Sequence, residues 1–241
     1  MNIKTKILIG TLAAALLPGL PGSAWARTVN VSAKAYSASS GKLLFTENHQ
    51  WTYAGQKPVR VVATYRSAAG QSLGKRVTDF TKDGRAPGAA PDEVFTKPSG
   101  YLERIQNRGG SFALSYREKT GAPVKSGTVA RSGITAGGQG LDNLILARWS
   151  ELNSGSRVAF KFLVPARQTA YSFSMRSLGR KTVRGRPALL IRVELSGVLS
   201  YVAPALDLYY DVERKHLVRY VGPSNFARET GEKKIRVEFF R

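Results

Sequence analysis

The chain has 241 residues, and its 37 lysines and arginines outnumber its 16 aspartates and glutamates, which gives a formal net charge of +21 at pH 7. Cysteine is absent, which excludes disulfide bonds and structural zinc sites built from thiolates. So large a positive surplus predicts attraction to polyanions, but it says nothing about the fold.

The first 26 residues have the layout of a secretory signal peptide. Lys4 and Lys6 precede the apolar run 7–17, and a small-residue end, Ala24-Trp25-Ala26, follows a Pro/Gly break. The run is shorter than the ~20 apolar residues that span a bilayer, and no later stretch is long enough for a transmembrane segment. We therefore expect cleavage after residue 26 and a soluble mature chain, 27–241, in the periplasm or secreted. Removing the charges of the two lysines from +21 leaves +19 on that chain.

The mature part consists mostly of short stretches in which apolar and polar residues alternate, the pattern of half-buried strands. Close spacing and Gly, Asn and Asp turns favour antiparallel pairing. One face of each strand is apolar and the other is rich in Arg, Lys and Ser, and a sheet of roughly a dozen such strands has to curl, close or split. The predicted strands are 28–36, 42–53, 59–66, 72–80, 101–107, 111–116, 157–162, 171–176, 189–196, 206–210, 216–221 and 234–239.

One segment, 140–155, has the periodicity of a helix. Its apolar residues are spaced to lie on one helical face: Leu141, Leu144, Ile145, Trp149 and Leu152. A glycine-rich stretch, 133–140, leads into it as a flexible loop, and Asn153-Ser154-Gly155 predicts a left-handed end. The segments 81–98 and 121–140 are expected to be irregular loops.

The predicted fold is therefore mainly β. It is a strongly curved antiparallel sheet or half-open barrel of roughly a dozen strands, with one principal helix packed against it, in a single β-rich domain, 27–241. The helix either fills a closed core or forms the wall or lid of a ligand cavity, and the sequence leaves both alternatives open.

Two groups of residues are candidates for binding an amphipathic ligand. Aromatic side chains expected to point inward would hold its apolar body, or would equally form an ordinary core. The candidate lining residues are Trp149, Phe160, Phe162, Tyr171, Phe173, Tyr209 and Phe239. Five cations at a predicted hairpin could contact phosphates or anionic head groups, or could simply be solvated. These are Arg176, Arg180, Lys181, Arg184 and Arg186.

Residues suited to catalysis are few. The chain has two histidines, His49 and His216, and no nucleophile elbow, zinc motif or phosphate-binding loop. Glu47 and His49 are two positions apart on a predicted strand, so they share a face, and His49 could act as a general base oriented by Glu47. A structural role for each histidine is the alternative, and no cofactor or metal is expected.

Three stretches carry a resemblance to a known group. They are GKLLFTENHQW at 41–51, GQGLDNLILARWSELNSGSRVAFKFLVPARQTAYSF at 138–173, and LDLYYDVERKHLVRYVGPSNF at 206–226. With the signal peptide, these resemble exported bacterial proteins of unknown function. The overall layout is also similar to the periplasmic lipoprotein-carrier superfamily, which implies a half-open antiparallel barrel that shelters acyl chains.

The sequence thus predicts a periplasmic or secreted binding or carrier protein for an amphipathic, anionic component of the cell envelope. A basic interaction protein with a solid core, acting on an anionic envelope surface, is the alternative, and a hydrolase using His49 is a third possibility. No physiological nucleic-acid partner is expected for an exported chain without a nucleic-acid-binding motif.

Overall fold

The computed structural model of the protein describes residues 26–81, 90–197 and 204–241. Residues 1–25 of the expected signal peptide lie outside the described residues, as do residues 82–89 of the expected loop 81–98. In the described part, no helix has the length and apolar character needed to cross a membrane.

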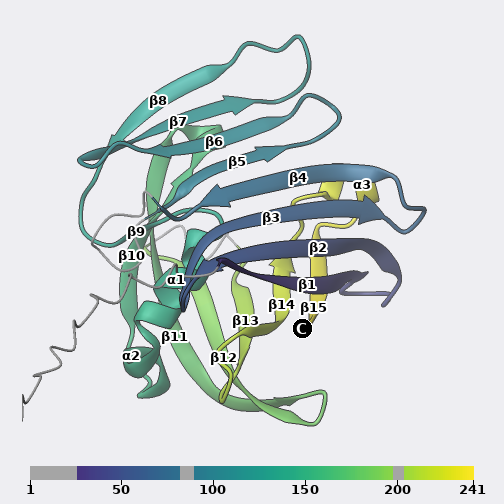
Figure 1. The fold of residues 1–241 in the computed structure, drawn as a ribbon, viewed down its shortest axis with the longest axis vertical. Helices are drawn as coiled ribbons and strands as arrows, with labels where there is room; N and C mark the ends of the chain where they lie inside the picture. Colours follow the sequence, from purple (N-terminus) through teal and green to yellow (C-terminus); the bar gives the residue numbers. More distant parts are fainter. Residues whose placement is uncertain (1–25, 82–89, 198–203) are drawn as a thin grey trace, which may run out of the picture.

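The described strands form one mainly antiparallel sheet, as the alternation predicted, with fifteen strands where roughly a dozen were expected (Figure 1). The strands are β1 (Ala26–Ser37), β2 (Leu43–Ala54), β3 (Lys57–Ser67), β4 (Ser72–Asp79), β5 (Asp92–Thr96), β6 (Leu102–Asn107), β7 (Ser111–Arg117), β8 (Lys125–Ala130), β9 (Thr135–Ala136), β10 (Val158–Val164), β11 (Thr169–Val183), β12 (Arg186–Leu195), β13 (Leu206–Asp211), β14 (Leu217–Pro223) and β15 (Lys234–Phe240).

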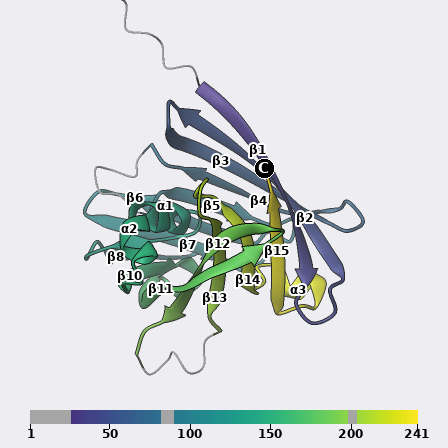
Figure 2. The ribbon, with the colours of Figure 1, turned by 90° about the horizontal axis from the view of Figure 1, so that it is seen from below.

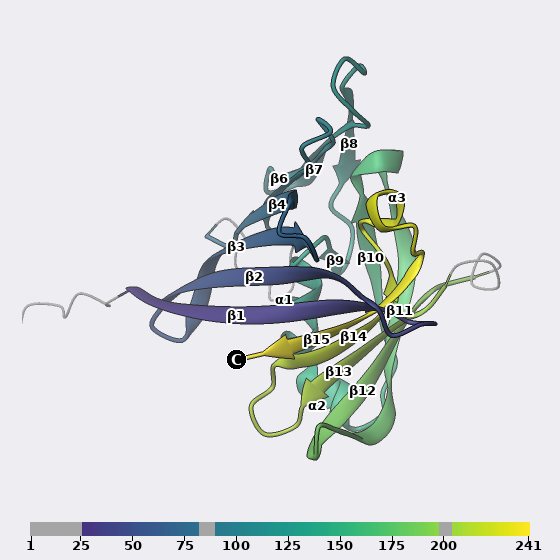
Figure 3. The ribbon, with the colours of Figure 1, turned by 90° about the vertical axis from the view of Figure 1, so that its right-hand side faces the viewer.

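Two meanders make up the sheet. One runs from β1 to β8 and the other from β9 to β15, and they join where β1 pairs with β15, for example Ala35 with Val237. The edges are β8 and β9, so the sheet of described strands is curved but not closed into a barrel. Figure 3 shows the consequence: the strands β1–β4 cross the direction of β10–β13.

The sequence missed three strands, because they lie in segments interpreted as loops. β5 follows a proline-rich stretch, β8 contains Gly127, and β9 is only a two-residue strand that pairs in parallel with β10. Each is short or has few apolar residues, so its alternation is weak, and its place in the sheet comes from pairing with longer neighbours.

The predicted helix is two helices. α1 (Gly140–Ala147) and α2 (Trp149–Asn153) are separated at Arg148, whose φ of −104° and ψ of 18° lie outside the helical range. The predicted left-handed end is confirmed, since Gly155 has φ of +86°. A short 3₁₀ turn, η1 (Pro165–Arg167), and the one-turn helix α3 (Ala227–Thr230) complete the described elements.

The two helices lie inside the curve of the sheet, next to β10 and β11 (Figure 2). Leu144, Ile145 and Leu152 are fully buried in a core with residues of β10–β13 such as Phe160 and Ile191. A second core lies over β1–β3, β5 and β15, where the side chain of Phe226 packs against Phe45, Tyr65 and Phe95. Between these two cores the interior is not filled.

The glycine-rich segment before α1 is closely packed, although the sequence predicted a flexible loop there. Gly138 has φ of +48°, and a Cβ at this position would lie 1.9 Å from Oε1 of Glu93. A Cβ on Gly140 would lie 2.5 Å from Pro91. The backbone between β9 and α1 therefore lies directly against the β4–β5 side of the sheet, which only glycine permits.

Candidate functional site

A cavity of about 590 Å³ lies between the two halves of the sheet. Strand β2 runs along it, because its alternate residues Phe45, Glu47, His49, Trp51 and Tyr53 all line the wall. At ~3.3 Å per residue, these side chains span a length of about 26 Å. The remaining wall comes from α1, β1, β3–β6, β10, β13–β15 and the chain around Phe226.

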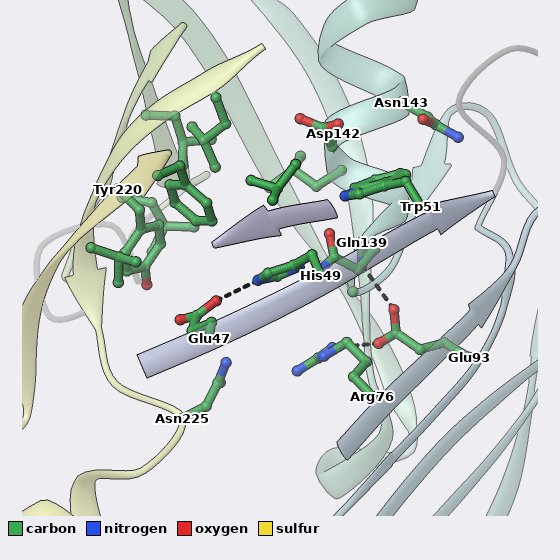
Figure 4. A pocket seen from close by; sticks show the side chains of 18 of the residues that line it. Glu47, His49, Trp51, Arg76, Glu93, Gln139, Asp142, Asn143, Tyr220 and Asn225 are labelled. Carbon is green, nitrogen blue, oxygen red and sulfur yellow. Dashed lines mark hydrogen bonds and ion pairs between the residues drawn. The ribbon is translucent and has the colours of Figure 1, made fainter. Parts of the chain in front are cut away.

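The two ends of the cavity carry different side chains. We name them the Arg76 end, formed by Glu47, Arg76, Glu93, Glu103 and Asn225, and the Arg241 end, formed by Tyr53, Asp142, Lys215, His216 and Arg241. Figure 4 shows Asp142 and Asn143 of α1 on one side of the cavity and Glu47, Arg76 and Asn225 on the other. The middle is apolar and includes Val31, Phe162, Leu208, Val237 and Phe239.

Glu47 and His49 form a buried pair in the wall. His49 Nε2 lies 2.6 Å from Oε2 of Glu47, and the two side chains are 6% and 10% exposed. The ring of His49 also lies 5.8 Å from that of Phe239 and 6.3 Å from that of Tyr65. The geometry that the sequence suggested is thus present, and a carboxylate at this distance fixes the orientation of the imidazole ring.

Arg76 and Glu93 form a second buried pair, on β4 and β5. Arg76 Nη1 donates to Oε1 of Glu93, while Oε2 accepts from Thr78 Oγ1 at 3.0 Å and from the Gln139 amide at 2.8 Å. The guanidinium also lies 4.5 Å from the ring centre of Phe95. Burial works against the positive charge, but the attractions of Glu93, Tyr65 and Glu103 together outweigh it and raise the pKa of Arg76 above its ordinary value.

Glu93 therefore connects the sheet to the helical segment. Its carboxylate accepts from β4 on one side and from the backbone just before α1 on the other. A carboxylate with three donors is well satisfied in a site of low polarity. The pair thus sets where α1 begins relative to the wall of the cavity.

At the other end, Asp142 in the first turn of α1 accepts a hydrogen bond from the hydroxyl of Tyr210 on β13. Burial raises the pKa of Asp142, although this hydrogen bond and the charges of His49 and Arg241 lower it. Burial likewise raises the pKa of Tyr210 well above its usual value, with Asp142 adding to the effect. The carboxyl group of Asp142 is therefore protonated more readily than one in water.

His216 lies at the same end, and its Nδ1 is buried without a hydrogen-bond partner in the described part of the chain. Burial lowers the pKa of His216, as do the charges of Arg241 and Arg214, while Asp211 opposes the shift. The neutral imidazole is therefore favoured, with one ring nitrogen free to accept or donate a hydrogen bond.

The structure brings two of the seven predicted aromatic residues to this cavity. Phe162 and Phe239 line it. Phe160 and Trp149 instead pack in the core beneath the helices, with Trp149 edge-on to Tyr210 at 6.1 Å, and Phe173 stacks on Phe160 at 5.9 Å.

The two remaining aromatic residues lie away from the cavity wall. Tyr171 is half-buried opposite Phe162 in the β10–β11 pair. Tyr209 is turned to the other face of β13, where it packs on Val183, Ala188 and Val218, and Tyr210 takes the inward position. Two adjacent tyrosines fit either alternation, so the sequence could not distinguish which one faces inward.

The five predicted cations lie on the β11–β12 hairpin, and all are exposed. The turn itself is Arg184-Gly185, with φ of +50° and +75°, and Arg176, Arg180 and Lys181 lie on β11 before it. Arg184 Nη2 donates to the carbonyl of Phe239 at 2.5 Å, which brings the hairpin tip to the Arg241 end. Arg186 lies 3.5 Å from Asp211, so part of its charge is compensated.

Sequence reasoning missed the most constrained polar residues of the site, Arg76, Glu93 and Asp142. On β4 the buried positions are Gly74, Arg76 and Thr78, whereas the apolar Leu73 and Val77 are only partly buried. Alternation alone therefore predicts the opposite face as the inner one. The one usable signal was the proximity of Glu47 and His49, because an i, i+2 pair on a strand needs no tertiary information.

No group of three or more His, Cys, Asp or Glu side chains in the described residues is placed to hold a metal ion. The described residues that line the cavity offer paired charges, tyrosine hydroxyls and two imidazoles around an apolar space. Such a space can bind a ligand of mixed character, and His49 is the residue in it best oriented to accept a proton.

No family model matches the sequence, and no curated protein does. Among solved structures, the chain is similar to a β-barrel-like protein of Domain of Unknown Function DUF1849 from Brucella abortus. The TM-score is 0.41 at 7% sequence identity, and the alignment covers 90% of this chain and 96% of that one. A likeness this distant assigns neither a family nor an activity, and the resemblance to exported proteins and to lipoprotein carriers stays a prediction.

Proposed function

We propose that the protein is an exported, periplasmic binding or carrier protein that holds an amphipathic, anionic component of the cell envelope. The observation that carries the proposal is the cavity of about 590 Å³. This volume is within the ~300–1,000 Å³ typical of small-molecule sites, and its apolar middle suits an acyl chain or another apolar body. The signal-peptide pattern of residues 1–26 supports export.

The Arg241 end suits the anionic group of such a ligand. Lys215 and Arg241 line it. Guanidinium groups bind carboxylate and phosphate oxygens in bidentate geometry. His216 adds a ring nitrogen whose hydrogen-bonding capacity is unused among the described residues.

The first experiment is native mass spectrometry of the mature chain purified from its own exported compartment, followed by organic extraction of whatever it releases. We expect a stoichiometric amphipathic molecule. A second preparation carries Val31→Trp, which places an indole in the apolar middle of the cavity and should exclude the ligand. A clean unliganded mass for the unaltered chain, in a preparation where a control carrier keeps its ligand, would overturn the proposal.

A second candidate is a basic protein that binds an anionic envelope surface without a small ligand. The exposed cations of the β11–β12 hairpin favour it. The Val31→Trp variant separates the two functions, since it should abolish ligand retention and leave vesicle binding unchanged. Binding to anionic vesicles should also weaken steeply with salt, because exposed charges are screened.

A hydrolase using His49 is a third candidate, supported by the 2.6 Å contact between His49 and Glu47 in the wall of the cavity. A defined turnover that disappears in His49→Ala, with the fold intact by circular dichroism, is the result that would support it.

A further inference from the structure

The charge inside the cavity differs from the charge on the outside of the protein. The whole chain carries +21, yet the Arg76 end has three carboxylates, Glu47, Glu93 and Glu103, against the single guanidinium of Arg76. His49 is the one other group in this part of the wall that can become positive. An anion entering this end would therefore meet a surplus of negative charge.

The cations near this end are already paired. Arg76 forms an ion pair with Glu93. The ammonium of Lys97 lies behind the wall, over the rings of Tyr101 and Phe226, and forms an ion pair with Glu229 at 2.9 Å. Neither has a free charge to offer an anionic group, so the end as a whole accepts hydrogen bonds better than it donates them.

Glu47 and Glu103 provide that accepting capacity. Glu47 has one oxygen on His49. Glu103 accepts from the hydroxyl of Tyr101, whose pKa is raised by burial and by this carboxylate. Each carboxylate can take further donors, because an ionised carboxylate has about four lone-pair sites. Leaving them against an apolar chain end would cost desolvation without a compensating bond.

The two ends therefore demand different groups on one ligand. Between Glu47 and Tyr53 the wall of β2 covers six residues, about 20 Å at ~3.3 Å each, and His49 and Trp51 line the wall between them. The Arg241 end supplies Lys215 and Arg241, which together outweigh the one buried carboxyl group of Asp142.

We propose that the ligand is bipolar: an anionic group binds at the Arg241 end, and a hydrogen-bond-donating or cationic group on the far end of its apolar chain binds Glu47 and Glu103. This inference rests on the proposed function and specifies its ligand class. A simple single-headed fatty acid satisfies one end only.

The test compares four twelve-carbon carboxylates that differ only at the ω-position: dodecanoate, ω-hydroxydodecanoate, ω-aminododecanoate and dodecanedioate. All four present the same carboxylate to the Arg241 end, but their net charges differ, because the ω-ammonium compensates that carboxylate and dodecanedioate carries a second one. The basic surface of the protein alone would therefore favour dodecanedioate over the ω-amino compound, which is the opposite of the order expected here. Isothermal titration calorimetry at ~0.15 M salt, where the Debye length is ≈ 8 Å, measures binding. We expect the ω-amino and ω-hydroxy compounds to bind at least about tenfold tighter than dodecanoate, equivalent to about 1.4 kcal/mol, and dodecanedioate to bind weakest.

Variants of the two glutamates test whether the preference for the ω-amino compound arises at the Arg76 end. Glu47→Gln and, separately, Glu103→Gln should reduce the advantage of the ω-amino compound over dodecanoate several-fold and improve binding of dodecanedioate. Glu118→Gln is the matched control, since it removes the same charge from a side chain that is 47% exposed and lies outside the cavity. The second glutamate variant keeps the test decisive if the first one fails to fold.

The outcomes separate the inference from the proposed function. Binding in which dodecanoate or dodecanedioate is tightest would overturn the bipolar ligand and leave an amphiphile carrier standing. The same preference for the ω-amino compound in all three glutamine variants would also overturn the assignment of the Arg76 end. Failure of all four compounds to bind, by a chain whose fold is verified, would overturn the bipolar ligand together with the acyl-type ligand of the proposed function.

Discussion

The two halves of the sheet differ in the side chains that lie on their concave face. Over β10–β13, α1 and α2 insert Leu144, Ile145 and Leu152, and the space is filled with apolar side chains. Over β1–β4 no helix of the described chain is inserted, and the inner side chains include Glu47, His49 and Arg76. Both halves have an apolar core, but only the β1–β4 half also presents buried charged pairs to the cavity.

The difference shows that the same alternation can produce a core or a site. An apolar inner face is stabilised by anything that removes it from water. A charged inner face is tolerated only when each charge has a partner, as Arg76 has Glu93 and His49 has Glu47. The helical segment therefore performs both roles considered for it, since its buried side fills the core while Leu141, Asp142, Asn143 and Leu146 line the cavity.

The largest loss of stability is expected from removing the ion pair between Arg76 and Glu93 in the cavity wall. Glu93→Gln leaves Arg76 buried without its counter-charge, which should lower the free energy of unfolding by about 3–5 kcal/mol. Urea denaturation measures it, and Glu118→Gln at an exposed ion pair should cost no more than about 1 kcal/mol. A loss as small for Glu93→Gln as for Glu118→Gln would mean that the pair does not stabilise this half.

The contrast between core and cavity predicts unequal costs for removing apolar side chains. Leu144→Ala creates a void in the filled half and should cost about 2–5 kcal/mol. Phe239→Ala, on a side chain that already borders open space, should cost about 1–2 kcal/mol despite its larger volume. Thermal and urea unfolding of both variants provide the comparison, and equal costs would contradict an open space beside Phe239.

The third prediction concerns pH and Asp142, at the Arg241 end of the cavity. Burial raises the pKa of Asp142 above its ordinary 3.8, so the folded chain binds more protons than the unfolded chain in the range just above that value. The free energy of unfolding should therefore fall as pH rises through this range, with a limiting slope of about 1.4 kcal/mol per pH unit from this group. Asp142→Asn keeps an acceptor for Tyr210 but cannot ionise, so its stability should increase relative to the unaltered chain as pH rises from 3.8.

Urea melts of both chains at a series of pH values measure that difference. Glu151→Gln, on an exposed carboxylate of α2, is the control and should give a curve parallel to that of the unaltered chain. A parallel curve for Asp142→Asn would mean that the carboxyl group titrates as it does in water.

The smallest effect on stability is expected on the outer surface. Replacing Arg176, Arg180 and Lys181 by Ser should change the free energy of unfolding by no more than about 0.5 kcal/mol per residue, because all three are exposed. Binding to anionic vesicles should weaken if this strand is the contact. Unchanged vesicle binding would remove the β11 cations from the site and leave the cations of the Arg241 end as the remaining candidates.

Much of the fold is readable in the sequence. Alternation located twelve of the strands, the helical periodicity located the α1–α2 segment, and the pairing of Glu47 with His49 followed from their spacing on one strand. These features depend on neighbours along the chain, which is why pattern alone reveals them. The same local information gave no reason to place Arg76 or Glu93 inside.

The site depends on what tertiary structure brings together. Arg76 and Glu93 are seventeen residues apart, and Asp142 and Tyr210 are sixty-eight apart, so no local pattern links them. The sequence by itself determined a curved β-sheet, one helical segment and a strongly basic chain. Only the tertiary structure decided which tyrosine of the 209–210 pair faces inward and why glycine precedes α1. It also decided that charged groups line an unfilled interior. Each of these depends on atoms that meet only when the two meanders join at β1 and β15.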